Sequence, residues 1–413
     1  MENFDILLKK YADFIVRVGV NPQPGQTLII NCCLEAAPLA RLCVRSAYEA
    51  GARDVLVNWS DNDVSRSRME LGSEEALSDF KSWQLRRYLD YAESEGSVCV
   101  LHIHADDPEV YAGLDGAKIS RVNAGQRKFM APWREYTMND RVQWSIAAMP
   151  SAPWAKKMFP DLDTDAAIEK LWQLIFDVCR VTGGDPVGEW KAHLDRLMTL
   201  RDKMNAFDLE SVHFKSSNGT DLTVGLADKA SWESAGSRNE KGVEFLPNIP
   251  TEEVFTAPHK DKVNGVVYGT KPYVFNGQLI KGFHVTFQDG KVVEHGAEEG
   301  ADLLGQLLDT DEGARSIGEV ALVPASSPIN RSGALFYSTL FDENAACHIA
   351  FGASYPGTTA NGTRLTKDEL LARGMNQSTI HEDVMVGAED SHITGKCRDG
   401  RTVELFRDGV WVL

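Results

Sequence analysis

The spacing of apolar residues changes at about residue 205, and this change restricts the folds that the chain can adopt. In the first half, runs typical of strands alternate with segments in which apolar residues recur at helical spacing. Strands that alternate with helices imply βαβ units and a parallel sheet. We therefore expect an N-terminal α/β domain with a helical connection over residues 1–205. Its expected strands are 27–31, 54–59, 98–104 and 143–148, and its expected helices are 4–18, 36–50, 73–95, 163–181 and 186–205.

After residue 206 the apolar residues lie in short alternating runs, which are typical of strands. Turn signals such as Asn218-Gly219, Asp289-Gly290 and Asp399-Gly400 separate these runs. The second half is therefore expected to form a β-rich α+β domain over residues 206–413. Because a chain of 413 residues exceeds the size at which one hydrophobic core usually stops growing, two domains are the expected organisation.

The charge balance and the cysteine content limit the partners and the compartment. A formal net charge of -17 repels phosphate backbones and anionic lipid headgroups, so we expect no nucleic-acid and no membrane partner. The sequence has no run of about 18 apolar residues that would span a membrane. Charges interrupt the apolar residues of the first segment, so a signal peptide is not expected. Seven cysteines, with no CxxC pair, indicate free thiols and a cytoplasmic protein.

Acidic residues and histidines in the second half form four candidate clusters for a metal site. Carboxylates together with histidines are the usual ligands of zinc, cobalt or manganese, and two ions that share a site need further acidic groups to offset their charge. The clusters are Glu252 and Glu253 between two prolines, Glu319 in an apolar strand, Glu343 with His348, and His381 with Asp383. Each cluster taken alone also fits exposed side chains on a loop or a strand edge.

Local geometry supports two of these clusters. If the segment from Glu343 to His348 is helical, the two side chains lie a little more than one turn apart and can converge on one ion. On a strand, His381 and Asp383 point to the same side, because residues two apart share a face.

A rival metal site lies in the first half. His102 and His104 end an expected parallel strand, where open α/β sheets often place ligands, and they also fit strand-end histidines bonded to the backbone. Thr182-Gly183-Gly184-Asp185 is expected to be a turn and not a phosphate loop, since no Lys-Ser/Thr follows it. The chain has no GxGxxG, GxSxG or HExxH motif, which argues against dinucleotide, serine-hydrolase and zincin chemistry.

Taken together and in this order, the four clusters resemble the aminopeptidase T family of two-metal aminopeptidases, which includes enzymes of the aminopeptidase S and PepS type. The matching strings are NIPTEEVFTAP at 248–258, GEVALVP at 318–324, LFDENAACHIAFGASY at 340–355, and the pair His381 and Asp383. The length and the order of an α/β half before a β-rich half are also similar, so the resemblance covers the whole chain.

The resemblance implies a homodimer that removes N-terminal residues from peptides through a water activated by two divalent ions, which would be zinc, cobalt or magnesium. Tyr355 would supply a catalytic hydroxyl, and Glu252 is the expected proton shuttle. Because adjacent residues on an extended chain face opposite ways, the choice between Glu252 and Glu253 as the ligand stays open. The implied metal ligands are Glu253, Glu319, Glu343, His348, His381 and Asp383.

Two other classes of function remain compatible with the residues themselves. The same ligands would serve another two-metal amidohydrolase or a phosphoesterase. A protein without enzymatic activity, whose acidic groups merely lie at the surface, is the third possibility. Metal content separates this third class from the first two, because six converging ligands should hold stoichiometric metal.

Overall fold

The computed structural model describes residues 3–94, 97–105, 107–275 and 278–413. Contacts divide the chain into two units. Unit 1 comprises Met1–Lys191 and Gly236–Pro250, and unit 2 comprises Ala192–Ala235 and Thr251–Leu413. The sequence predicts a boundary between two domains at residues 205 and 206. Because domains are parts that fold independently, this boundary stays a prediction.

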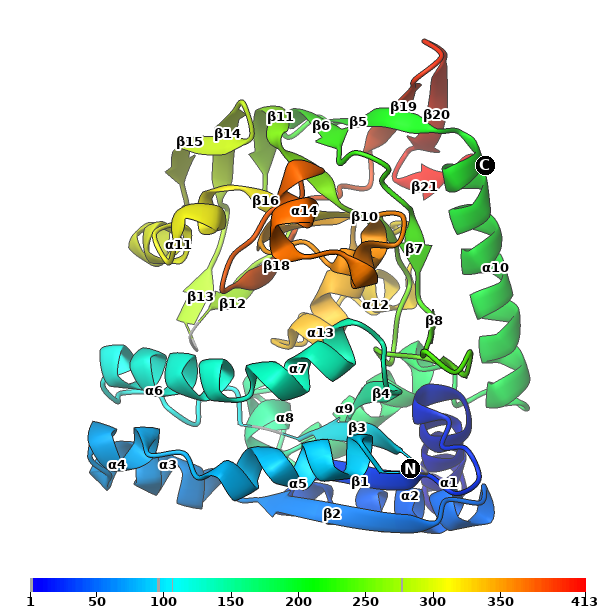
Figure 1. Cartoon of the computed structure of the whole chain (residues 1–413), viewed down its shortest axis with the longest axis vertical. Coiled ribbons are helices and arrows are strands. Elements are labelled where there is room, and N and C mark those ends of the chain that lie inside the picture. Colours follow the sequence, from blue (N-terminus) through cyan, green and yellow to red (C-terminus); the bar gives the residue numbers. More distant parts are fainter. Residues whose placement is uncertain (1–2, 95–96, 106, 276–277) are drawn as a thin grey trace. The chain divides into compact units, whose positions relative to one another are not determined.

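Unit 1 is built on a four-stranded sheet in which each neighbouring pair of strands is parallel. Strands β1 and β3 are buried along most of their length, as expected for parallel strands that are covered on both faces. The predicted parallel sheet is therefore confirmed, and its strands are coloured blue to cyan in Figure 1. Across the sheet the order is β2 (Asp54–Ser60), β1 (Thr27–Cys33), β3 (Val98–His104) and β4 (Trp144–Ala148).

Helices connect these strands, and one of the predicted helices is wrong. In place of a single helix over 73–95, helix α4 ends at Ser78 and α5 begins at Ser82. Each has its own start, because the Ser73 side chain accepts a hydrogen bond from the N–H of Ala76, and the Gln84 side chain accepts one from the N–H of Lys81. The helices are α1 (Phe4–Phe14, continued by a π-helix over Ile15–Val20), α2 (Ala37–Glu49), α3 (Asn62–Leu71), α4 (Glu74–Ser78), α5 (Ser82–Ala92), α6 (Gly116–Phe129), α7 (Ala131–Met138), α8 (Ala152–Met158), α9 (Thr164–Val178) and α10 (Pro186–Ala206), whose last part belongs to unit 2.

Unit 2 is rich in strands, as predicted, and contains two larger sheets, both antiparallel. One has five strands, in the order β18 (His381–Met385), β17 (His348–Gly352), β16 (Ile317–Leu322), β10 (Val254–Thr256) and β7 (Glu233–Ser234). Every residue of β16 and β17 is buried, so polar side chains on these strands need partners inside the unit. This sheet carries most of the expected metal ligands.

The other sheet of unit 2 has eight strands and joins segments that are far apart in the sequence. Strand β19, near the C-terminus, pairs with β5, so red and green ribbons lie side by side in Figure 1. The order is β15 (Lys291–Gly296), β14 (His284–Gln288), β11 (Pro258–Tyr268), β6 (Asp221–Leu226), β5 (Leu209–Lys215), β19 (His392–Cys397), β20 (Thr402–Arg407) and β21 (Val410–Trp411).

The remaining elements are short. Unit 2 also has the hairpin β12 (Tyr273–Phe275) with β13 (Gln278–Ile280), and the helices α11 (Ala301–Leu308), α12 (Pro328–Arg331), α13 (Thr339–Asp342) and α14 (Lys367–Ala372). Strands β8 (Ser237–Arg238) and β9 (Glu244–Phe245) pair within unit 1.

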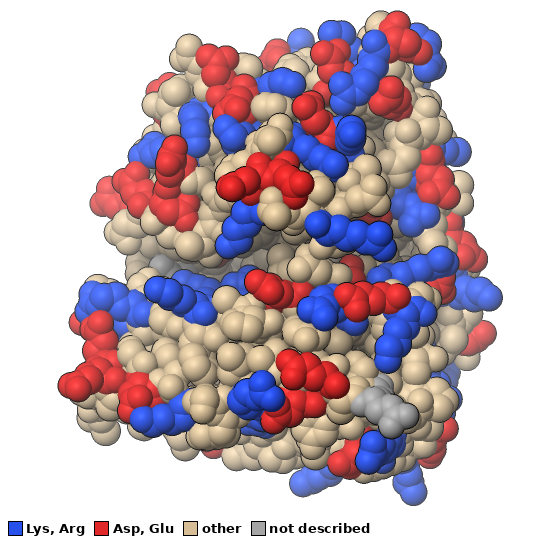
Figure 2. Space-filling view, viewed as in Figure 1, with Lys and Arg blue, Asp and Glu red and all other residues tan. Residues whose placement is uncertain are grey.

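Charged side chains of both signs are interspersed on the face of the molecule in Figure 2. Exposed ion pairs among the described residues include Arg121 with Glu74 at 2.8 Å. Pairs of this kind contribute little to stability, because solvent screens exposed charges. Among the described residues, no helix has the length and apolar character to cross a membrane.

Candidate metal centre

Strand register places four of the six expected ligands on one face of the five-stranded sheet. Ala350 of β17 pairs with Glu319 of β16 on one side and with Asp383 of β18 on the other. His348 lies two residues before Ala350, and His381 lies two residues before Asp383. Because directly opposed residues share a face, as do residues two apart on a strand, these four side chains point the same way. The methyl group of Ala350 at the middle of the group takes up little room.

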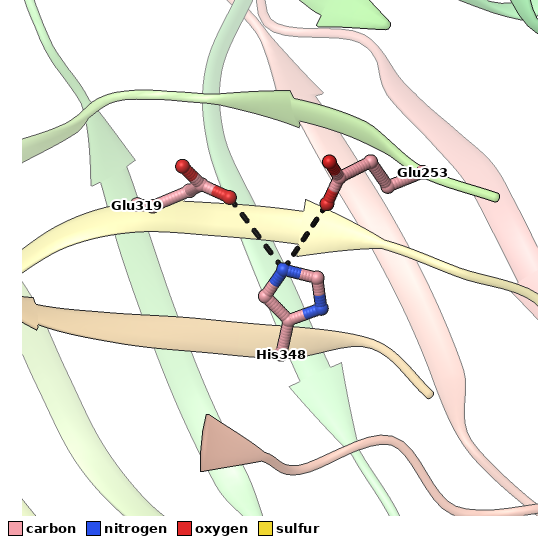
Figure 3. Close-up of side chains that lie close together, drawn as sticks. All are labelled: Glu253, Glu319 and His348. Carbon is pink, nitrogen blue, oxygen red and sulfur yellow. Dashed lines mark ion pairs between the residues drawn. The ribbon is translucent and has the colours of Figure 1, made fainter. Parts of the chain in front are cut away.

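Glu253 completes a first group of three ligands with His348 and Glu319, shown in Figure 3. The Nε2 atom of His348 lies 3.2 Å from Oε2 of Glu253 and 3.5 Å from Oε1 of Glu319. All three side chains are buried. Glu253 immediately precedes β10, which pairs with β16, and ligand atoms of Glu253 and Glu319 lie within 4.8 Å of one another.

Glu319 also belongs to a second group, with His381 and Asp383. Its other oxygen, Oε2, lies 3.6 Å from Nε2 of His381, which in turn lies 3.5 Å from Oδ1 of Asp383. Each oxygen of the Glu319 carboxylate therefore faces a different histidine. A carboxylate in this position lies between two potential ion sites.

Backbone carbonyls orient both imidazole rings. Nδ1 of His348 lies 3.2 Å from the carbonyl oxygen of Ala346, and Nδ1 of His381 lies 2.7 Å from that of Ala353. A carbonyl oxygen only accepts hydrogen bonds, so Nδ1 of each ring donates and Nε2 is directed toward the carboxylates. Outer contacts of this kind fix the ring orientation of histidine ligands in metal sites.

The electrostatics of the cluster are dominated by its carboxylates. Burial alone would lower the pKa of both histidines, but the neighbouring carboxylates raise it, to about 10 for His381 and well above the ordinary value for His348. Burial raises the pKa of Glu319 and of Glu343, and for Glu343 the charges of Asp383 and other carboxylates add to the effect. The group as a whole therefore attracts positive charge.

The donor set fits a divalent cation. Carboxylate oxygens and imidazole nitrogens are the usual ligands of borderline and hard divalent ions. Burial of so many carboxylates is costly unless a cation or protons offset their charge. Within the described part of the chain, Oδ1 of Asp383 is buried and receives no hydrogen bond, which leaves its lone pairs for an ion.

The segment from Glu343 to His348 is not one continuous helix, so the condition under which a helix would bring the two side chains together is not met. A 3-10 turn, η4 (Glu343–Ala345), is followed by extended backbone at Ala346, and β17 begins at His348. Pairing of β17 with both β16 and β18 outweighs the local helical pattern. Glu343 is still buried, and the side-chain nitrogen of Asn344 lies 3.3 Å from its Oε1.

The two adjacent glutamates lie in different surroundings. Whereas Glu253 contacts His348, the carboxylate of Glu252 lies 3.5 Å from Nε2 of His193 on helix α10. Both glutamates are buried, so the alternative of a solvated loop does not hold for this segment. The two carboxylates therefore contact different histidines.

Tyr355 lies against the second group of ligands. Its ring centroid is 4.6 Å from that of His381 and 6.4 Å from that of Phe255. Burial raises the pKa of the Tyr355 hydroxyl well above its ordinary value, and the nearby carboxylates raise it further. The hydroxyl therefore keeps its proton at neutral pH and is a hydrogen-bond donor.

The rival histidines His102 and His104 lie at the end of β3 in unit 1. Burial and the charge of His104 lower the pKa of His102 to about 4. Among the residues that the structure describes, the groups of three ligands within reach of one ion both lie in unit 2, and neither includes these histidines.

Two polar residues near the centre were not predicted, namely His193 and Asn344. Asn344 lies in the string DENAACH between an expected carboxylate and an expected histidine, which is a signal that sequence reasoning passed over. His193 lies in a helical segment with the polar and apolar residues of any amphipathic helix, and its local sequence carries no signal.

The chain is similar to a known family and to several of its members. The model of a family described as thermophilic metalloprotease (M29) matches residues 4–411. Aminopeptidase 2 of Geobacillus stearothermophilus is 44% identical over 411 residues, which cover 100% of this chain and 99% of the relative. Aminopeptidase T of Thermus aquaticus is 40% identical over 413 residues and the whole of both chains.

A solved structure extends the similarity to the fold. The structure described as wild-type AmpT from Thermus thermophilus matches with a TM-score of 0.92 and 37% identity, over 99% of this chain and 100% of that one. This match confirms the predicted fold class, and the full-length matches confirm the resemblance on which the expected ligands rest. The donor groups of unit 2 and the family description together indicate a divalent metal. The chain therefore belongs to the M29 family of metalloproteases.

Proposed function

We propose that this protein is a metal-dependent aminopeptidase that removes N-terminal residues from peptides at a centre of two divalent ions. The observation that carries the proposal is the position of Glu319, whose two carboxylate oxygens face His348 at 3.5 Å and His381 at 3.6 Å. Two ions that share a site need a bridging carboxylate. The metalloprotease family, and relatives that are named aminopeptidases, support the activity.

In this proposal different side chains have different roles in the reaction. With an ion held by its ligands, the site would supply Lewis-acid chemistry, which would polarise the scissile carbonyl and lower the pKa of water toward neutrality. The Tyr355 hydroxyl donates a hydrogen bond to the oxyanion that develops in the transition state. Glu252 accepts a proton from water and returns it to the leaving amine. The residues that hold the ions are Glu253, Glu319, Glu343, His348, His381 and Asp383.

The acidic cluster also accounts for preference for a free N-terminus. Carboxylates attract the α-ammonium group of a peptide substrate, and this group lies one residue's length from the first peptide bond. An acetylated peptide lacks that charge and should bind weakly. The substrate class is therefore peptides with a free amino terminus.

The proposal extends to the ions, the assembly and the compartment. Oxygen and nitrogen donors without cysteine sulfur favour zinc, cobalt or magnesium. We expect a homodimer, which light scattering on the purified protein would test, since a monomer's mass would contradict it. Buried free cysteines support a cytoplasmic protein.

A substrate panel tests the activity. The protein loaded with each ion in turn should hydrolyse amino-acid p-nitroanilides and short peptides, and it should leave their N-acetylated forms intact. Faster hydrolysis of p-nitrophenyl phosphate than of any aminoacyl anilide would instead favour a phosphoesterase. Hydrolysis of acetylated substrates at an equal rate would favour another amidohydrolase.

A further inference from the structure

Side chains, and not strand pairing, hold the backbone that carries Glu252 and Glu253. Residues 251–253 lie outside any strand, and β10 begins only at Val254. The peptide unit between Thr251 and Glu252 offers one carbonyl oxygen and one N–H. Two buried side chains from distant parts of unit 2, His193 and Asn344, bond to these two groups.

His193 holds the carbonyl. Its Nε2 lies 2.9 Å from the oxygen of Thr251 and 3.5 Å from Oε2 of Glu252. Nη2 of Arg196 lies 3.5 Å from the other ring nitrogen, Nδ1. Because a guanidinium only donates, Nδ1 accepts and Nε2 carries the hydrogen. The imidazole therefore donates to the Thr251 carbonyl and directs the same N–H toward the Glu252 carboxylate.

Asn344 holds the N–H of the same peptide unit. Its Oδ1 accepts a hydrogen bond from the backbone N–H of Glu252 at 2.7 Å. Its Nδ2 lies 3.3 Å from the carbonyl oxygen of Leu340 and 3.3 Å from Oε1 of Glu343. Since both of these are acceptors, the amide can point only its oxygen at Glu252. Asn344 thereby connects the backbone of Glu252 to the side chain of Glu343.

We propose that His193 and Asn344 are positioning residues that fix the peptide unit between Thr251 and Glu252, and with it the directions of the Glu252 and Glu253 carboxylates. This inference rests on the proposed function, in which one carboxylate holds an ion and the other moves a proton. A peptide unit that is bonded through both its carbonyl oxygen and its N–H is held against rotation, so the two side chains that follow it leave the backbone in fixed directions. Removal of either support would let both carboxylates move.

The test measures zinc affinity and turnover separately. The variants are His193→Ala, His193→Gln and Asn344→Ala, with His392→Ala as a matched control because His392 also contacts a carboxylate, that of Glu404, but at the surface. Zinc affinity is measured by competition with a chelator, and kcat and KM on an amino-acid p-nitroanilide. Loss of an outer contact of this kind typically costs about 10–100-fold in metal affinity or activity.

We expect His193→Ala to bind zinc about tenfold or more weakly and to lose about 10–100-fold in kcat, with KM little changed. His193→Gln should recover most of both losses, because its amide places an N–H near the former Nε2. Asn344→Ala should resemble His193→Ala. The double variant should lose little more than either single one, because both residues act on one peptide unit. The control His392→Ala should match the wild type.

A lower melting temperature with wild-type zinc affinity and wild-type kcat would overturn the inference, since it would make His193 merely structural. Should His193→Ala fail to fold, wild-type zinc affinity and turnover in Asn344→Ala would overturn it equally. Failure of the proposed function looks different, because the wild-type protein would then bind zinc but release no amino acid. In that case the zinc affinities of the variants, measured by competition with a chelator, would still test the inference.

Discussion

Tyr355 is the residue at which a structural role and the proposed catalytic role can be separated most cleanly. Its ring packs against His381, and Tyr355→Phe keeps the ring while it removes the hydroxyl donor. Loss of one preorganised oxyanion donor typically lowers turnover by about 10²–10³-fold, whereas a neutral hydrogen bond contributes only about 1 kcal/mol to stability. We therefore predict turnover lower by about two orders of magnitude, with normal metal content and a nearly unchanged melting temperature.

The matched control for this variant is Tyr273→Phe, which removes the hydroxyl of another buried tyrosine in unit 2. Tyr273→Phe should keep wild-type turnover on the same aminoacyl anilides. If Tyr355→Phe kept wild-type turnover and lost stability, Tyr355 would be a core residue.

His102 is expected to make the stability of the protein depend on pH. Burial lowers its pKa to about 4 in the folded state, against about 6.5 in an unfolded chain. Above about pH 6.5 the imidazole is neutral in both states, and its contribution is complete. Between these values the unfolded chain binds the proton more readily, so stability falls as the pH drops, by at most about 3 kcal/mol.

The corresponding measurement compares melting temperatures of the wild type and His102→Gln from pH 7 to pH 4. The variant should lose less stability over this range, because its amide does not titrate. Equal losses in the two proteins would show that His102 does not carry this dependence.

At the residue scale, the sequence alone could not have assigned the ligands. Glu253 and Glu319 each fit an exposed glutamate, and only their burial in unit 2 excludes that alternative. The choice between Glu252 and Glu253 depends on which way an extended backbone turns, and that is set by contacts with His193 and Asn344 from distant segments. The His193 contact has no local sequence pattern, whereas Asn344 lies between an expected carboxylate and an expected histidine.

At the scale of elements, β17 holds the centre together through its pairing with β16 and β18, and Gly352 limits what this pairing tolerates. Gly352 has φ of 103°, and a Cβ atom there would lie 2.3 Å from the carbonyl oxygen of Ile380, the residue before His381. Backbone strain of this type costs about 1–3 kcal/mol. We predict that Gly352→Ala lowers stability by about 2 kcal/mol and weakens metal binding, because it displaces the start of β18.

Gly357→Ala is the control, since a Cβ atom there meets no other atom within 4 Å. Urea unfolding and chelator competition on both variants would check the prediction. Equal stability and equal metal affinity in Gly352→Ala and the wild type would show that β18 can adjust to the added methyl group.

Variants at the end of strand β3 test whether unit 1 contributes any metal ligand. His102 and His104 end this strand, and the groups of ligands found among the described residues lie in unit 2. The double variant His102→Ala/His104→Ala should therefore bind as much metal per chain as the wild type, as measured by elemental analysis. Loss of one equivalent would move an ion to the end of β3.

Strands proved easier to predict than the segments between them. The run 98–104 coincides with β3, because a parallel strand buried on both faces is apolar throughout. The segment 73–95 reads as one helix because its apolar spacing continues, yet side-chain caps at Ser73 and Gln84 start two helices. The sequence leaves open whether the segment from Glu343 to His348 is helical, and strand pairing, which depends on residues far away in the sequence, sets its conformation from His348 onward.

At the scale of the whole molecule, the change in the spacing of apolar residues near residue 205 predicts a parallel sheet followed by a β-rich half, and the structure has both. The order of strands could not be predicted, because β19 pairs with β5 across about 180 residues and local patterns carry no information on such pairings. The segment Gly236–Pro250 belongs to unit 1 although it follows part of unit 2 in the sequence. This assignment could not be predicted for the same reason.

The central claim is that the carboxylates and histidines of unit 2 hold the divalent ions on which peptide hydrolysis depends. The most direct test removes metal by exhaustive dialysis against a chelator, confirms its absence by elemental analysis, and assays aminoacyl anilide hydrolysis before and after each ion is returned. We predict no hydrolysis by the metal-free protein and recovery with zinc, cobalt or magnesium, up to two equivalents per chain. Full activity of the protein with no metal left would contradict the account.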